Sequence, residues 1–445
     1  MINKRIFTVA LLATIFLVTS SMSYYQFRRT KSIRTFPDTV AYTSIASYPI
    51  FSSIFWTGIK NPNTNSRPLV YPLFIKLCGS NSMRIVHGQL LLSITCWAFL
   101  ASCVVYVLKR PWARIVSFAL IEVFTLTTSV SMWHKVILSE SLTCSLLVVC
   151  VGSWLLFTHR QSLFTTCAVI CSTGAYSFSR DSNGYLVLML GVLLLVLSIS
   201  KVAMRQKSRF PALRLQLFVA STLIVIFIAT DISSNIGQRW MFPFFNNMAQ
   251  RILPKEVHMQ WFKARGMPYN TALMERAGKW ASSDNLAFYV DERLENFREW
   301  TLTKGKADYV QWILLHPTYL LVDPVRDLKN MLCADLSFYA PSDFKSLIRW
   351  PYPLGESTNL LYAFALGMLL SFCLGNWSRH NNLIVVVPTV LIAFVIPHLI
   401  VIWHGDAMEL IRHSVQVVVQ INIALLLLIA LFTDIVLEKY DPIPD

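Results

Sequence analysis

Apolar residues fall in long blocks along the chain, separated by polar segments. The blocks cover residues 6–22, 86–108, 115–133, 140–157, 162–178, 184–202, 215–232, 358–375, 383–402 and 413–436. A helix needs roughly 20 predominantly apolar residues to cross about 30 Å of hydrocarbon, and each block has about that length. The pattern predicts an all-α polytopic membrane protein with about ten transmembrane helices.

Two longer segments interrupt the apolar blocks and predict regions outside the membrane. Helix-like stretches within the second, at 291–303 and 307–315, indicate a mainly helical domain. The expected organisation is a first transmembrane helix in 1–23, a first extracytoplasmic loop in 24–85, transmembrane helices 2–7 in 86–232, an extracytoplasmic domain in 233–357, and transmembrane helices 8–10 with a cytoplasmic tail in 358–445.

Basic residues set the predicted orientation. With a cytoplasmic N-terminus, the turns that hold several cations, such as the one with Lys109, Arg110 and Arg114, fall on the cytoplasmic side. The short turns of the opposite side hold single cations, as the positive-inside rule requires. The first apolar block is short and ends in small residues, so it also fits a cleaved signal peptide. Both interpretations put residues 24–85 outside the cytoplasm.

Composition agrees with a membrane protein and argues against nucleic-acid binding. Hydrophobic residues make up 55% of the chain and charged residues 14%, with a mean hydropathy of +0.51. That is too little charge to cover the surface of a water-soluble protein of this length. The net charge of +15 is explained by cytoplasmic loops and contact with anionic lipid. We expect no nucleic-acid partner, since no basic-aromatic binding module is present.

A few polar positions leave alternatives open. Cys78 and Cys333 fall in the two regions predicted outside the membrane, so they could form a disulfide. Glu122 lies in the middle of an apolar block and is either a buried polar contact or part of a pathway. The cysteines show no CxxC or Cys/His spacing of a metal site.

Acids and arginines gather at the predicted outer ends of the helices. Pro37 and Asp38 suit the start of a helix in which Asp38 and Tyr42 share one face. Asp38 could simply cap that helix. Taken together, however, the polar positions of the outer turns predict a binding or active site on the extracytoplasmic face. The candidates are Asp38, Tyr42, Arg67, Tyr71, Glu140, Arg180, Asp181, Asp406, Glu409 and Arg412.

These same segments carry a resemblance to a known family. The chain resembles the GT-C superfamily of membrane glycosyltransferases, and within it the bacterial proteins related to protein O-mannosyltransferases and aminoarabinose transferases. The matching segments are Pro-Asp-Thr-x-x-Tyr at 37–42, Arg-Pro-x-x-Tyr-Pro at 67–72, Ser-Glu-Ser at 139–141, His-Pro-x-Tyr at 316–319, and Gly-Asp-Ala-Met-Glu at 405–409 with Arg412 and His413.

The resemblance implies an integral glycosyltransferase of the plasma (inner) membrane with its active site on the extracytoplasmic face. It implies a sugar donor linked to polyprenyl phosphate and a glycan, lipid or protein acceptor, with Asp38 as the catalytic base. Arg180 or Arg412 would offset the charge of the departing phosphate, and Glu140 and Asp181 would orient the acceptor or hold those arginines. The first loop has the single acid Asp38 where several relatives have a pair, so we expect no obligatory metal and no cofactor.

Two other functions fit the same pattern. A non-enzymatic lipid or glycan transporter also has many spans and outer charges, although an internal repeat typical of transporters is missing from the sequence. An O-antigen polymerase has many spans and a large outer loop, and would depend on outer-loop arginines more than on an early Asp. No Walker, GxGxxG, HExxH or GxSxG motif is present to indicate another enzyme class.

Overall fold

The computed structural model describes residues 4–57, 66–203, 210–332, 336–348, 357–377 and 383–440. Within these ranges the chain is helical and contains no β-strand, only two isolated bridges. The main helices of the bundle are α1 (Lys4–Arg29), α5 (Ser82–Val107), α6 (Pro111–Phe124), α8 (Ser139–His159), α9 (Leu163–Ser177), α10 (Asp181–Ala203), α11 (Phe210–Ile236), α20 (Ser357–Trp377), α21 (Leu383–Ala393), α22 (Val395–Gly405) and α23 (Leu410–Tyr440).

The predicted apolar blocks fall on these bundle helices, except that the block at 115–133 continues past the end of α6. Among the described residues, seven segments are long and apolar enough to cross a membrane: Ile6–Arg29, Ser82–Val107, Ser139–His159, Asp181–Ser200, Leu213–Ile236, Ile384–Gly405 and Leu410–Glu438. Leu163–Ser177 and Ala363–Leu374 are shorter apolar helices. The all-α membrane architecture expected from the sequence is therefore confirmed. The expected count of about ten spans is not, since seven segments of the described residues reach full spanning length.

The block at 115–133 is not one continuous helix. Helix α6 ends at Phe124, where the Thr125 hydroxyl donates a 2.6 Å hydrogen bond to the carbonyl of Glu122. The chain continues as α7 (Thr128–Ser131) and the 3-10 turn η1 (Met132–Lys135). Hydroxyl side chains that bond nearby carbonyls compete with regular helix, and three threonines lie between residues 125 and 128. A hydropathy pattern does not report such hydrogen bonds, so the break was not predicted.

Glu122 makes a buried polar contact between helices. Its Oε2 accepts a 3.0 Å hydrogen bond from the hydroxyl of Thr19 in α1. Glu122 is 3% exposed, and α6 packs against α1. The sequence left Glu122 as either a buried polar contact or part of a pathway. Among the described residues, Thr19 supplies the partner for a buried polar contact.

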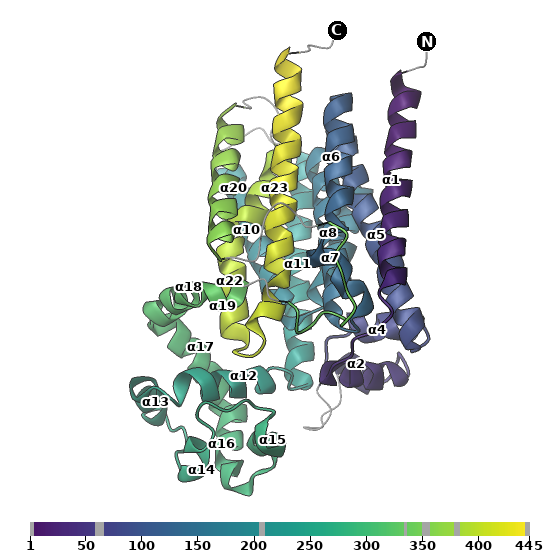
Figure 1. Ribbon diagram of the computed structural model, residues 1–445. Helices are drawn as coiled ribbons and strands as arrows, with labels where there is room; N and C mark the ends of the chain where they lie inside the picture. The colour runs from purple at the N-terminus through teal and green to yellow at the C-terminus, as the bar shows by residue number, and fades with distance from the viewer. Residues whose placement is uncertain are drawn as a thin grey trace.

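Both ends of the chain lie at one end of the bundle, and the regions predicted outside the membrane lie at the opposite end (Figure 1). We refer to that opposite end as the outer end, by its position in the bundle alone. The first loop forms α2 (Pro37–Ser47), α3 (Ser53–Thr57) and α4 (Val70–Leu77). A lobe of short helices follows α11: α12 (Met241–Asn247), η2 (Met248–Ile252), α13 (Glu256–Lys263), α14 (Thr271–Met274), α15 (Ser283–Val290), η3 (Glu292–Leu294), α16 (Glu295–Trp300), η4 (Thr301–Gly305), α17 (Lys306–Leu315), η5 (Thr318–Val322), α18 (Asp323–Arg326) and α19 (Leu328–Leu332).

The lobe has a core of its own, built largely from aromatic rings. Phe245 stacks on Phe288 with ring centroids 4.8 Å apart, and Phe297 stacks on Trp300 at 5.6 Å. The same core includes Trp403 of α22, so the lobe packs directly on the bundle. Large aromatic side chains supply much buried area per residue. This area stabilises the packing of the short helices against the end of the bundle.

The last part of the predicted extracytoplasmic domain packs with the bundle instead of the lobe. In residues 336–348, Tyr339 belongs to the bundle core, and the carboxylate of Asp343 accepts hydrogen bonds from the backbone of Lys31 and Ser32 after α1. This segment thereby closes over the outer end of the bundle beside the first loop. The predicted pair of Cys78 with Cys333 lies outside the described residues, because Cys333 does.

Candidate active site

Helix α2 holds Asp38 against the outer end of the bundle. Phe36 occupies the N-cap position, and its backbone N–H donates to the hydroxyl of Thr39 at 2.9 Å. That hydroxyl donates in turn to the carbonyl of Ile137 at 2.7 Å. One turn on, the Tyr42 hydroxyl donates to Ser139 at 3.2 Å. These bonds fix α2 to the start of α8 and leave the side chain of Asp38 facing the site.

Two arginines bond the carboxylate of Asp38. Arg67 donates to Oδ1, and Arg412 Nη2 donates to Oδ2 at 3.0 Å. Burial raises the pKa of Asp38, but the charges of Arg67 and Arg412 outweigh it and hold the pKa below its ordinary value. Asp38 is therefore ionised at neutral pH, and its side chain forms ion pairs with residues from elsewhere in the chain.

Glu140 lies behind this first set of ion pairs. Its side chain is 1% exposed, and its Oε1 is 3.4 Å from Arg180 Nη1 and 3.3 Å from Arg412 Nε. The carboxylate thus neutralises Arg180 and Arg412 from the side that faces away from the cavity. Glu140 can hold these arginines but does not line the cavity they face.

The turn between α22 and α23 contributes two more acids. Glu409 forms an ion pair with Arg412 at 2.9 Å and accepts a hydrogen bond from the Tyr339 hydroxyl at 3.3 Å, and its backbone is left-handed with a φ of 54°. Burial raises the pKa of Glu409. Asp406 accepts from the Asn246 amide of the lobe at 2.9 Å, and burial raises its pKa to about 6. Both carboxyls stand out from ordinary surface acids, as groups at functional sites often do.

Asp181 pairs with an arginine that sequence analysis missed. Arg239 Nε donates to Asp181 Oδ2 at 3.0 Å and Nη2 donates to Oδ1 at 2.8 Å, a two-point contact. This pair ties the start of α10 to the end of α11. The available signal was position alone, since Arg239 is a cation just beyond the outer end of a predicted span.

One cavity of about 800 Å³ gathers most of the predicted site. It lies between the outer ends of the membrane helices and the lobe. Eight of the ten predicted residues line it: Asp38, Tyr42, Arg67, Arg180, Asp181, Asp406, Glu409 and Arg412. Arg239, Arg298 and Lys306 also line it, although the sequence did not single them out.

Tyr71 and Glu140 are the two predicted residues outside the cavity lining. The Tyr71 side chain is fully buried, its hydroxyl donates to Gln89 at 2.8 Å, and its ring meets that of Tyr42 edge-on at 4.7 Å. It supports Tyr42 from behind. Both residues therefore act on the cavity through the side chains that they touch.

The cavity combines an ionised carboxylate with several guanidinium groups in a partly buried setting. Guanidinium forks bind phosphate and carboxylate oxygens at two points. Among the described residues, no group of three or more His, Cys, Asp or Glu side chains is arranged to hold a metal ion. Chemically, the site can bind an anionic group and hold a carboxylate beside it.

The comparisons with known proteins leave this geometry as the basis for inferring function. No protein-family model matches the chain. No curated protein matches it in sequence.

Proposed function

We propose that this chain is an integral membrane glycosyltransferase. It moves a sugar from a polyprenyl-phosphate-linked donor to a glycan, lipid or protein acceptor of the cell envelope, on the extracytoplasmic face of the plasma membrane. The observation that carries the proposal is the position of Asp38 between Arg67 and Arg412 in the cavity at the end of the bundle. The resemblance at residues 37–42, 67–72 and 405–413 supports the same function.

The reaction is a displacement at the anomeric carbon of the donor sugar. The acceptor hydroxyl oxygen forms the new bond to that carbon, while the bond from the carbon to the phosphate oxygen breaks. The phosphate keeps the electron pair, and the acceptor proton passes to Asp38 as general base. Arg412 and Arg180 offset the charge that gathers on the phosphate.

The arginines that bond Asp38 also explain how it could become basic enough. A carboxylate held by Arg67 and Arg412 is a weak base, because their charges lower its pKa. A donor phosphate competes for these guanidinium groups, since they bind phosphate oxygens as readily as carboxylates. In this proposal phosphate binding weakens the pairs to Asp38 and raises its proton affinity when the acceptor arrives.

The cavity also has an apolar wall, formed by two helices of spanning length, that suits a lipid-linked donor. Tyr185 of α10 and Phe227 of α11 both line it, with ring centroids 5.4 Å apart. Both residues lie in helices of spanning length. A prenyl chain could therefore stay among apolar groups while its phosphate reaches the arginines.

The test is Asp38→Asn, assayed for sugar transfer from a polyprenyl-phosphate sugar to envelope glycans. Asn keeps the shape of the side chain but cannot take the proton, so transfer should fall about 10²–10⁴-fold. The matched control is Asp284→Asn on the lobe, where the carboxylate is 49% exposed and pairs with Arg276 and Lys279. This control should transfer at the normal rate.

Near-normal transfer by Asp38→Asn, with the protein folded and expressed, would remove Asp38 from the role of base. Failure of the function itself would look different. In that case envelope glycans would be the same with and without the intact protein, and the unaltered chain would transfer no sugar from any polyprenyl-phosphate donor tried.

A polymerase of lipid-linked glycans is the second candidate. It is favoured by the number of arginines around the cavity, namely Arg67, Arg180, Arg239, Arg298 and Arg412. Such an enzyme would also use a lipid phosphate as leaving group. It differs in its product, which would lengthen in steps of several sugars instead of gaining one.

A further inference from the structure

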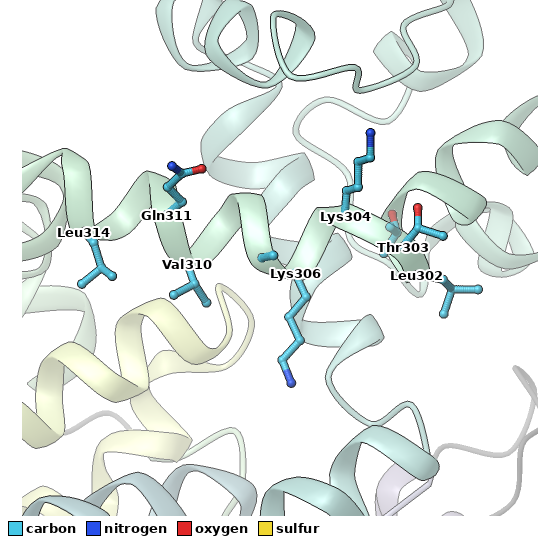
Figure 2. Close-up of a pocket in the computed structure, with 9 residues that line it drawn as sticks. Leu302, Thr303, Lys304, Lys306, Val310, Gln311 and Leu314 are labelled. Atoms are coloured by element: carbon cyan, nitrogen blue, oxygen red, sulfur yellow. The ribbon is translucent and has the colours of Figure 1, made fainter.

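An apolar groove runs along η4 and α17 of the lobe. It has a volume of about 530 Å³, and Leu302, Val310 and Leu314 are among the residues that line it. These side chains are 49%, 48% and 68% exposed. Figure 2 shows Val310, Leu314 and Lys306 on one side of the helical segment; Gln311, drawn on its other side, also lines the groove.

The groove is continuous with the polar cavity. Leu302 and Lys306 line both of them. Lys306 Nζ is 2.6 Å from Asn235 Oδ1 and 3.5 Å from Asp231 Oδ1, at the outer end of α11. Polar groups therefore mark the boundary at which the charged cavity passes into the apolar groove. This sequence of environments matches an amphiphile, with its head in the cavity and its chain in the groove.

The position of the groove separates this amphiphile from the donor. The apolar wall formed by Tyr185 and Phe227 lies in helices of spanning length, where a prenyl chain can remain in the bilayer. The groove belongs to the lobe beyond the ends of those helices. One cavity thus has two apolar surfaces at different depths, which suits two lipid-borne substrates.

We propose that the groove along η4 and α17 binds an alkyl chain of the acceptor, an amphiphile whose hydroxyl-bearing head lies in the cavity. The assignment of this amphiphile as the acceptor rests on the proposed glycosyltransferase function. Of the acceptor classes considered above, the groove selects a lipid-borne one over a soluble protein or a free glycan.

Photo-crosslinking in lipid nanodiscs tests this directly on the full chain. A benzophenone amino acid replaces Val310 or Leu314 in two variants, and Val257 of α13 in the matched control, because Val257 is an apolar lobe residue that is 79% exposed and does not line the groove. The probe is hexadecyl glucoside, added with phospholipid and with or without polyprenyl phosphate. We expect probe adducts at 310 and 314 at least about tenfold above those at 257, unaffected by polyprenyl phosphate.

Chain length and charge supply two further readouts. For chains short enough to lie wholly within the groove, each methylene removed from the probe should weaken its apparent affinity about fourfold. A negative charge in the groove should also weaken binding: Leu314→Glu should reduce adducts at 310 at least about tenfold, and Val257→Glu, outside the groove, should leave them unchanged.

Several results would overturn the assignment. Adducts with phospholipid alone would make the groove a bilayer contact, and equal adducts at 257 would make the capture non-specific. Displacement of the probe by polyprenyl phosphate would assign the groove to the donor chain, and the glycosyltransferase proposal would still stand. Failure of that proposal would appear separately, as absent sugar transfer by the unaltered chain with the adducts at 310 and 314 intact.

Discussion

Glu140 offers a sharp test of the electrostatics beneath the cavity. Its side chain is 1% exposed, and its Oε1 lies 3.4 Å from Arg180 and 3.3 Å from Arg412. Arg412 also pairs with Asp38 and Glu409, whereas Glu140 supplies the ion pair of Arg180 among the described residues. The change Glu140→Gln should therefore leave Arg180 as the more poorly compensated of the two charges.

The expected cost follows from these distances. Two unit charges about 3.4 Å apart attract by about 5 kcal/mol at an effective dielectric constant of about 20. Loss of hydration offsets part of that attraction, and removing one partner of a buried pair typically costs about 3–5 kcal/mol. We expect Glu140→Gln to lose about 3 kcal/mol of unfolding free energy. In Glu140→Gln with Arg180→Gln, part of the loss should return, because the unpaired charge is gone.

The measurement is equilibrium unfolding by sodium dodecyl sulfate in mixed micelles, followed by tryptophan fluorescence. Glu438→Gln is the matched control, because Glu438 pairs with Lys109 at 3.1 Å but the two side chains are 48% and 66% exposed. An exposed pair of this kind contributes at most about 1 kcal/mol. If Glu140→Gln cost no more than Glu438→Gln, or if the double variant lost the sum of both single losses, the proposed pairing would be wrong.

Two further predictions concern the turn between α22 and α23. Burial raises the pKa of Asp406 from 3.8 to about 6, so the folded state favours its protonated form, and this stabilisation is present at low pH and lost as the pH rises through about 6. In Asp406→Asn the unfolding free energy should fall less between about pH 4.5 and pH 7.5 than in the unaltered protein. An equal fall in both proteins would refute the raised pKa of Asp406. The left-handed φ of Glu409 predicts that the free energy of unfolding of Glu409→Gly is about 1 kcal/mol higher than that of Glu409→Ala. Both variants lose the pair with Arg412, so equal stabilities would contradict the backbone strain.

Much of the bundle could be predicted from hydropathy because each apolar block needs a helix to pair its backbone groups. Where prediction fell short, hydrogen bonds between side chain and backbone decided the structure. The third apolar block breaks after Phe124, since Thr125 and Thr127 bond the carbonyls of Glu122 and Phe124. Such bonds depend on which rotamer a hydroxyl adopts, and a hydropathy pattern carries no information about it.

The candidate site was predictable as a set of residues but not as a set of contacts. Acids and arginines at outer helix ends could be recognised because charge is costly at membrane depth. Their pairing could not, since Arg412 and Asp38 are 374 positions apart. Arg239 was missed for a related reason. Arg239 belongs to the site through its two-point contact with Asp181, which lies 58 positions earlier in the chain.

The least predictable feature is how the lobe holds the turn that carries Asp406 and Glu409. A helix leaves its last carbonyls without partners in the helix itself, and α22 ends at Gly405. Asn247 of the lobe donates to the carbonyl of His404 at 2.9 Å, and Arg251 donates to the carbonyl of Trp403 while stacking 3.7 Å above its ring.

These donors come from α12 and η2, next to Asn246, which bonds Asp406 directly. The carbonyls of Trp403 and His404 at the end of α22 are thus bonded by the lobe, while that of Ile402 is bonded by the backbone of Asp406. It follows that the lobe is part of the site: its displacement would leave buried carbonyls unpaired and free the turn from which Arg412 reaches Asp38.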